Sequence, residues 1–114
     1  MNNVSLSGFV GKQPTIRKSE AGNETIATFS IAVKQFFTRN GQKEEKTNWI
    51  PIVAFSRNAE LVEKYVESGK LIGITGCLNQ NSFEDAATGE KKSSIEVILE
   101  KIDFFSLPKT NEEQ

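Results

Sequence analysis

The chain has 114 residues, of which 37% are hydrophobic, and a formal net charge of −1. This length suffices for one compact domain with its own core and is too short for two. No apolar run reaches the roughly 18 residues of a membrane span, and residues 1–5 lack the pattern of a signal peptide. We therefore expect a cytoplasmic protein with no membrane contact.

The side-chain inventory argues against a metal site and against catalysis. The chain contains no histidine and a single cysteine, Cys77, so neither a disulfide framework nor a zinc site has enough ligands. Nothing in the sequence places a base beside Cys77 or a serine, as nucleophilic catalysis would require. We predict no cofactor, no metal and no enzymatic activity, and we expect Cys77 to be a small packing residue.

Charge is distributed unevenly along the chain. Residues 1–57 carry eight Lys or Arg against four Glu, a balance of +4, whereas residues 58–114 carry six against eleven acidic residues, a balance of −5. Because salt screens charges beyond roughly 8 Å, a basic side can hold a phosphate backbone even when the whole molecule is acidic. The overall acidity predicts weaker and more salt-sensitive binding than a strongly basic domain would show.

The first half of the chain reads as strands. Apolar residues alternate with polar ones from Val4 to Val10, residues 11–14 interrupt, and residues 15–18 resume, which we interpret as one long bent strand. Residues 21–24 have turn composition, and a second strand follows around Phe29, Ile31 and Val33. A charged loop, residues 38–46 with Asn40-Gly41 at its tip, then leads to a third strand, Thr47–Phe55.

The second half contains the single expected helix and two more strands. Leu61, Val62, Tyr65 and Val66 form a helical stripe that Gly69 ends, with Ser56 or Asn58 as the capping residue. A fourth strand covers Leu71–Phe83, with Ile72, Ile74, Gly76 and Leu78 on its apolar face. Residues 84–90 turn the chain, Ile95 opens a fifth strand, and residues 108–114 form a short polar tail.

Five strands with one helix between the third and fourth is the order of an OB-fold barrel. We therefore predict an all-β domain with one helix over residues 1–107, followed by the tail. In this fold, strands two and three and two of the loops form the usual ligand face, which can take oligonucleotides, oligosaccharides or proteins.

Four aromatic residues lie among polar ones, which is typical of rings that stack on nucleobases. They are Phe37, Trp49, Phe55 and Phe83. Phe83 falls on the polar face of its strand, although twist or a bulge could turn it into the core. Trp49 and Phe55 share a strand face with Val53 and so have a core interpretation as well.

The sequence resembles the bacterial single-stranded DNA-binding protein family from about Met1 to Leu107. The resemblance lies in Asn3-Val4 with Gly8, residues 11–17 (GKQPTIR), 27–32 (ATFSIA) and 47–55 (TNWIPIVAF), Ala59-Glu60 with Tyr65, Gly69-Lys70, Gly76-Cys77-Leu78 and Thr88-Gly89.

The resemblance implies a protein that coats transient single strands in replication, recombination and repair, usually as a homotetramer. It places the family's base-stacking positions on Phe37, Trp49, Phe55 and Phe83. The alternation from Phe29 instead puts Phe37 on the core side and Phe36 on the solvent side, so Phe36 remains a second candidate.

A protein that coats single strands does not have to recognise the base sequence of the DNA. Every base has a flat face on which an aromatic ring can stack, and Lys and Arg side chains contact phosphates at any sequence. The candidates for phosphate contacts are Lys12, Arg17, Lys18, Lys34, Arg39, Lys43, Lys46 and Arg57.

Family members commonly end in an acidic, Phe-terminated tip that recruits other proteins, whereas this sequence ends in residues 109–114 (KTNEEQ). Tail-mediated partners are therefore not expected, and an accessory protein of a plasmid, phage or other mobile element is one interpretation. Three alternative functions remain: a primosome-type OB protein, a protein-binding OB adaptor, and an RNA-binding OB domain. Comparing matched DNA and RNA oligomers would separate the last of these.

Overall fold

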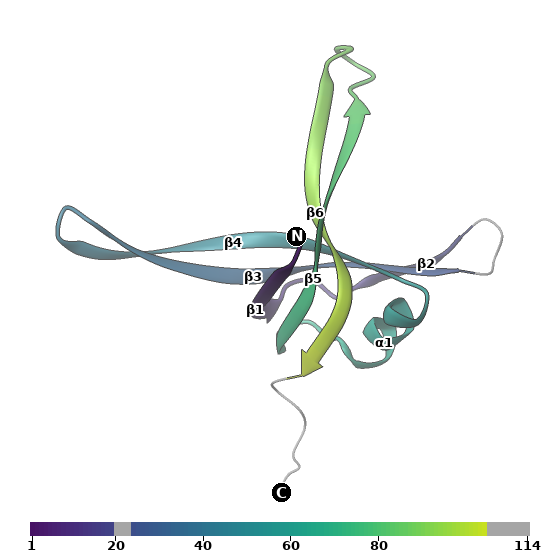
Figure 1. The fold of residues 1–114 in the computed structure, drawn as a ribbon, viewed down its shortest axis with the longest axis horizontal. Coiled ribbons are helices and arrows are strands. Elements are labelled where there is room, and N and C mark those ends of the chain that lie inside the picture. The colour runs from purple at the N-terminus through teal and green to yellow at the C-terminus, as the bar shows by residue number, and fades with distance from the viewer. Residues whose placement is uncertain (20–23, 105–114) are drawn as a thin grey trace, which may run out of the picture.

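The computed structural model describes residues 1–19 and 24–104, which form one barrel with two projecting hairpins (Figure 1). The sheet order is β1-β5-β6-β4-β3-β2, and β1 also pairs with β3, which closes the barrel. The elements are β1 (Val4–Val10), β2 (Thr15–Lys18), β3 (Thr25–Arg39), β4 (Gln42–Phe55), α1 (Arg57–Tyr65), β5 (Leu71–Glu84) and β6 (Lys91–Phe104). Because β1 and β2 together fill the first strand position, the predicted five-stranded OB-fold with its helix between strands three and four is confirmed.

The barrel closes where β1 passes from β5 to β3. β1 pairs with β5 from Val4 to Phe9 and with β3 through Phe9 and Val10. A Cβ atom on Gly8 would lie 2.2 Å from the backbone oxygen of Ala32, so only glycine permits this close approach. The core inside the closed barrel consists of Val10, Ala27, Phe29, Ile31, Ile52, Ala54, Ala59, Val62, Val66, Ile72, Ile74, Val97 and Leu99.

The predicted interruption at residues 11–14 is confirmed, but it divides the stretch 4–18 into two strands that both pair with β3, instead of one long bent strand. β1 lies between β5 and β3, whereas β2 pairs only with β3. The chain leaves the sheet between them, where Pro14 has no N–H to offer a ladder.

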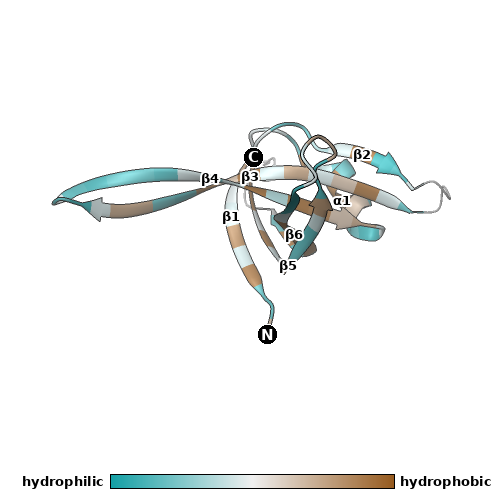
Figure 2. Ribbon diagram, turned by 90° about the horizontal axis from the view of Figure 1, so that it is seen from above, coloured by the Kyte–Doolittle hydropathy of each residue, from teal (hydrophilic) through white to brown (hydrophobic). Residues whose placement is uncertain are grey.

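The predicted loop over residues 38–46 is also wrong. β3 and β4 stay paired from Ile26↔Phe55 to Arg39↔Gln42, so that only Asn40 and Gly41 form the turn. Both have positive φ, 53° and 77°, the conformation of a tight type I′ hairpin turn. The hairpin projects from the barrel as an arm, and its outer part is largely hydrophilic (Figure 2).

The fifth strand begins at Lys91, four residues before the predicted Ile95, and makes a second arm with β5. Leu78, opposite the buried Val97 at the base of this arm, is 50% exposed instead of buried as its place in the alternation predicted. Where β5 crosses the barrel, Thr75 pairs with Lys101 and Gly76 with Leu99, so the extra residue of this bulge lies on β6. The alternation of β5 therefore continues unbroken to Phe83.

The helix α1 begins after Ser56, but neither predicted capping side chain caps it. Ser56 occupies the N-cap position, and its hydroxyl bonds the Glu24 carboxylate at 3.0 Å instead of a helix N–H. Asn58 lies inside the helix and donates its amide to the backbone oxygen of Leu99 at 3.1 Å. These two contacts attach the helix to the barrel. Within residues 1–19 and 24–104, no helix has the length and apolar character needed to cross a bilayer.

Two expectations lie outside the described residues: most of the turn at residues 21–24, and the tail at residues 108–114.

Candidate nucleic-acid interface

Three of the aromatic candidates lie on the face of β3 and β4 that points away from the core. Cross-strand partners share a face, and the buried pair Phe29↔Ile52 marks the core side. The residues of the opposite parity form a surface that we call the outer face. Its cross-strand rows are Phe36/Glu45, Lys34/Thr47, Ala32/Trp49, Ser30/Pro51, Thr28/Val53 and Ile26/Phe55.

The rings on this face are open to solvent. The exposed fractions are 72% for Phe36, 60% for Trp49 and 39% for Phe55. Val53, on the same face, is buried, yet Trp49 and Phe55 are not, so their core interpretation is wrong.

The strand register separates Phe36 from Phe37. Phe37 lies on the opposite side of the β3–β4 arm, half-buried, in the row it shares with Glu44. The Arg39 guanidinium carbon lies 5.5 Å from the centroid of the Phe37 ring, and Arg39 Nε lies 3.6 Å from a Glu44 carboxylate oxygen. Phe37 is therefore covered by neighbours on its own face, and Phe36 is the ring in line with Trp49.

A groove of about 670 Å³ runs along the outer face beside Trp49. A Cβ atom on Gly11 would lie 2.8 Å from Trp49 Cζ3, so the bare backbone of Gly11 is what allows the indole to lie there. The groove is bounded by residues from three parts of the fold, namely the segment Gly11, Lys12, Gln13 and Thr15, the strand residues Thr28, Phe29, Ser30, Trp49, Pro51, Ile52 and Val53, and Glu96 of β6.

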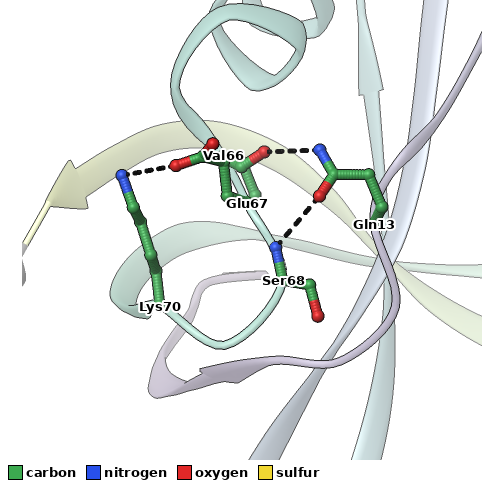
Figure 3. A network of polar contacts seen from close by, with 5 residues as sticks. All are labelled: Gln13, Val66, Glu67, Ser68 and Lys70. Atoms are coloured by element: carbon green, nitrogen blue, oxygen red, sulfur yellow. Dashed lines mark hydrogen bonds and ion pairs between the residues drawn. The ribbon is translucent and has the colours of Figure 1, made fainter.

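Gln13 holds the segment that carries Lys12 in place (Figure 3). The Gln13 amide donates to the backbone oxygen of Val66 at 3.5 Å and accepts from the Ser68 N–H at 3.2 Å. The Ser68 hydroxyl donates to the backbone oxygen of Gly11. The connection between β1 and β2 is thus fastened to the chain that follows α1, which fixes the rim of the groove.

The outer face continues onto the β5–β6 arm through Glu96. Glu96 pairs with Asn79 across the two strands, and the Asn79 amide donates to its carboxylate at 3.3 Å. Four residues farther along β5, Phe83 lies opposite Lys92 on the same face and is 50% exposed. The predicted placement of Phe83 on the wetter face is confirmed, and the interpretation that turned it into the core is wrong.

Five of the basic candidates lie on or beside the outer face. Lys12 lines the groove, and Arg17 is paired with Ile26, next to Phe55 in the same row. Lys34 and Lys43 are on the outer side of the β3–β4 arm, where Lys34 Nζ lies 3.3 Å from the Glu45 carboxylate. Arg57 is exposed at the start of α1, two residues beyond Phe55.

The other three basic candidates point elsewhere. Lys18 pairs with the buried Thr25 and donates its ammonium to the Thr25 hydroxyl at 2.8 Å. Arg39 and Lys46 lie on the side of the arm that carries Phe37. The structure therefore does not bring these three to the groove.

Comparison with known proteins places the chain in a family. Over residues 1–105 the sequence matches the single-strand binding protein family. The chain belongs to this family. It is 32% identical over 111 residues to "Single-stranded DNA-binding protein 3" of Clostridium acetobutylicum, an alignment that covers 97% of this chain and 75% of that protein. It is also 32% identical over 114 residues to "Single-stranded DNA-binding protein 1" of Staphylococcus aureus, covering 100% of this chain and 71% of that protein.

A solved structure of the same family is similar in fold. The structure described as "Plasmodium falciparum SSB complex with ssDNA" superposes with a TM-score of 0.84 at 29% sequence identity. The match covers 93% of this chain and 96% of that one.

Two residues of the interface of this single-strand binding protein were not predicted from the sequence. Lys92 faces Phe83 across the arm, and it was hidden because the fifth strand was expected to begin only at Ile95. Lys92 Nζ lies 3.2 Å from Asp85, and the Ala87 N–H and Lys92 hold the pKa of Asp85 below its usual 3.8. Glu96 was not among the candidates, because only the β4–β6 pairing places it in the groove.

Proposed function

We propose that the chain coats single-stranded DNA with its outer face. The chain binds single-stranded DNA, as members of its family do, and supports replication, recombination and repair. The observation that carries the assignment of the surface is the alignment of exposed rings, Phe36, Trp49, Phe55 and Phe83, on one face that borders a groove.

The chemistry of this face suits binding without sequence preference. Each ring can stack on any base, for about 1 to 3 kcal/mol per base, and Lys12, Arg17, Lys43 and Arg57 supply charges for the phosphates. The one acid that lines the groove, Glu96, would repel a phosphate. We assign Phe37, the position that the family spacing selected, a supporting role in the arm, and we assign the chain no catalytic role.

We also propose that the chain acts in the cytoplasm as a homo-oligomer, and specifically as a tetramer. The support within the described residues is the edge of β1: Val4 to Ser7 pair with β5 on one side and have no strand partner on the other. Such an edge favours pairing with another chain. Light scattering at micromolar concentration tests this, and a monomer mass would contradict it.

Trp49 supplies the test of the DNA-binding surface. As the only tryptophan, it should lose fluorescence when oligo-dT is added, in proportion to the bound fraction. Trp49→Ala should weaken binding by about 1 to 3 kcal/mol, whereas the matched variant Trp49→Phe, which keeps a ring, should bind nearly as well as the parent. Saturation reported by the anisotropy of a labelled oligomer, with unchanged Trp49 emission, would overturn the assignment.

A further inference from the structure

Phe9 is an exposed ring that none of the roles assigned so far uses. It lies in β1 between two buried residues, Gly8 and Val10, yet 49% of its own surface is exposed. Because strand residues alternate between faces, Phe9 points out of the barrel with Ser5 and Ser7. A large apolar side chain on an otherwise small and polar strand face contributes little to the core.

The strand register places Phe9 beside Trp49. Phe9 pairs with Ala32 of β3, and Ala32 pairs on its other side with Trp49 of β4. The three residues thus form one row across three adjacent strands, with the Cα atoms of Phe9 and Trp49 about 10 Å apart. Both rings project to the outer face, and the small side chain of Ala32 lies between them.

The indole of Trp49 extends toward β1, the strand that carries Phe9. Trp49 Cζ3 reaches to 2.8 Å from the position that a Cβ of Gly11 would take, so the indole extends from β4 across β3 to the end of β1. Gly11 is only two residues beyond Phe9. Gly11 and Trp49 line the groove, whereas Phe9 lies outside its lining, in the same cross-strand row as Trp49.

We propose that Phe9 is a further base-stacking residue, which receives the nucleotide that follows the one on Trp49 as the strand leaves the groove. This inference rests on the proposed function of the outer face and extends the binding path across β1. The occupant is a nucleobase of the same strand, because the next flat, exposed surface in the row of Trp49 is the Phe9 ring.

A set of substitutions at position 9 tests whether the ring itself binds. Phe9→Ala and Phe9→Leu should each weaken binding of oligo-dT by about 5- to 150-fold, because leucine keeps the apolar volume but has no aromatic face. Phe9→Tyr should bind within about threefold of the parent, since its ring stacks equally well. The matched control is Ile95→Ala, which removes a side chain that is 57% exposed on the opposite face of the β5–β6 arm and should leave affinity unchanged.

A fluorescent reporter gives a direct readout of contact. In the double variant Phe9→Trp/Trp49→Phe the only indole is at position 9, and its emission should be quenched in step with saturation by oligo-dT. Unchanged emission at saturation, or equal affinity of Phe9→Ala and the parent, would overturn the inference while leaving the proposed function intact.

Two further outcomes are also decisive. If Phe9→Ala lowers the oligomer mass measured by light scattering, and the loss of affinity is explained by that dissociation alone, Phe9 is a contact between copies of the chain. In that case the inference is wrong. If the parent protein itself fails to bind oligo-dT, the proposed function fails together with this extension of it.

Discussion

The contribution of a ring to binding can be measured by removing it only if the core stays intact, and Phe83 meets this condition. It is half-exposed on the β5–β6 arm, where its row contains only Lys92. Phe83→Ala should weaken single-strand binding by about 1 to 3 kcal/mol and leave the melting temperature nearly unchanged. Titration and thermal melting of the same preparation check this, and a sharp fall in melting temperature would show that Phe83 belongs to the core.

An acidic side chain in the groove works against phosphate binding. Glu96 lines the groove and accepts a hydrogen bond from Asn79, which a glutamine oxygen could also accept. Glu96→Gln should therefore strengthen binding of oligo-dT, most clearly at low salt, because it removes a repulsion that salt screens. Glu100→Gln, an exposed change on the same strand, is the control. Weaker binding by Glu96→Gln would mean that the carboxylate supports the groove.

At the residue scale, period-two alternation predicted which way the rings point, although it predicted a buried Leu78 that is 50% exposed. It placed Phe83 on the outer face and favoured Phe36 over Phe37, and the structure agrees on both. The alternation could not show which cross-strand pairs of the β3–β4 hairpin lie next to which pairs of the β5–β6 hairpin. The place of Glu96 in the groove depends on the parallel pairing of β4 with β6, Ile52↔Val97, which is a long-range contact that no local pattern reveals.

At the element scale, the two arms were the least predictable part of the fold. Residues 38–46 are charged and polar, which is typical of a loop, yet all but Asn40 and Gly41 are paired strand. Outside the barrel a hairpin needs no apolar face, because its backbone hydrogen bonds and cross-strand pairs such as Lys34–Glu45 are compatible with water on both sides. The Asn40-Gly41 turn was the one local signal of the hairpin, and its position was predicted correctly.

Barrel closure depends on the absence of a side chain at one position. Gly8→Ala would drive a methyl group into the Ala32 carbonyl, which belongs to backbone and cannot rotate away. We expect this variant to separate β1 from β3 and to lower the melting temperature sharply, whereas Ser7→Ala, an exposed change next to it, should be nearly neutral. Thermal melting followed by circular dichroism measures both, and equal stability of the two variants would contradict the closure argument.

At the scale of the whole molecule, the face on which each Lys or Arg side chain lies should decide how strongly DNA affinity depends on salt concentration. Lys12 and Lys43 lie on or beside the outer face, whereas Lys46 lies on the opposite side of the arm and Lys64 on the helix. Changing Lys12 and Lys43 together to Gln should reduce the slope of log affinity against log salt by about 1.4, at about 0.7 for each phosphate contact on a single strand.

The double change of Lys46 and Lys64 to Gln alters net charge equally and should reduce the slope much less. Binding measured across a salt series separates the two variants. Equal slopes would mean that overall charge, and not the outer face, governs binding.

The spacing of side chains along β4 also bears on the shape of the bound strand. Same-face residues of a strand repeat about every 6.8 Å, twice the 3.4 Å rise of stacked bases along one strand of duplex DNA. Trp49 and Phe55, six residues apart, are therefore separated by about 20 Å, a length that would hold about six bases in helical stacking. A base that stacks on one of these rings gives up a neighbouring base as its stacking partner, so a strand held by both rings would have its own base stack interrupted at two points about 20 Å apart. We therefore expect bound DNA to resist re-annealing, because an interrupted stack cannot pair continuously with a complementary strand.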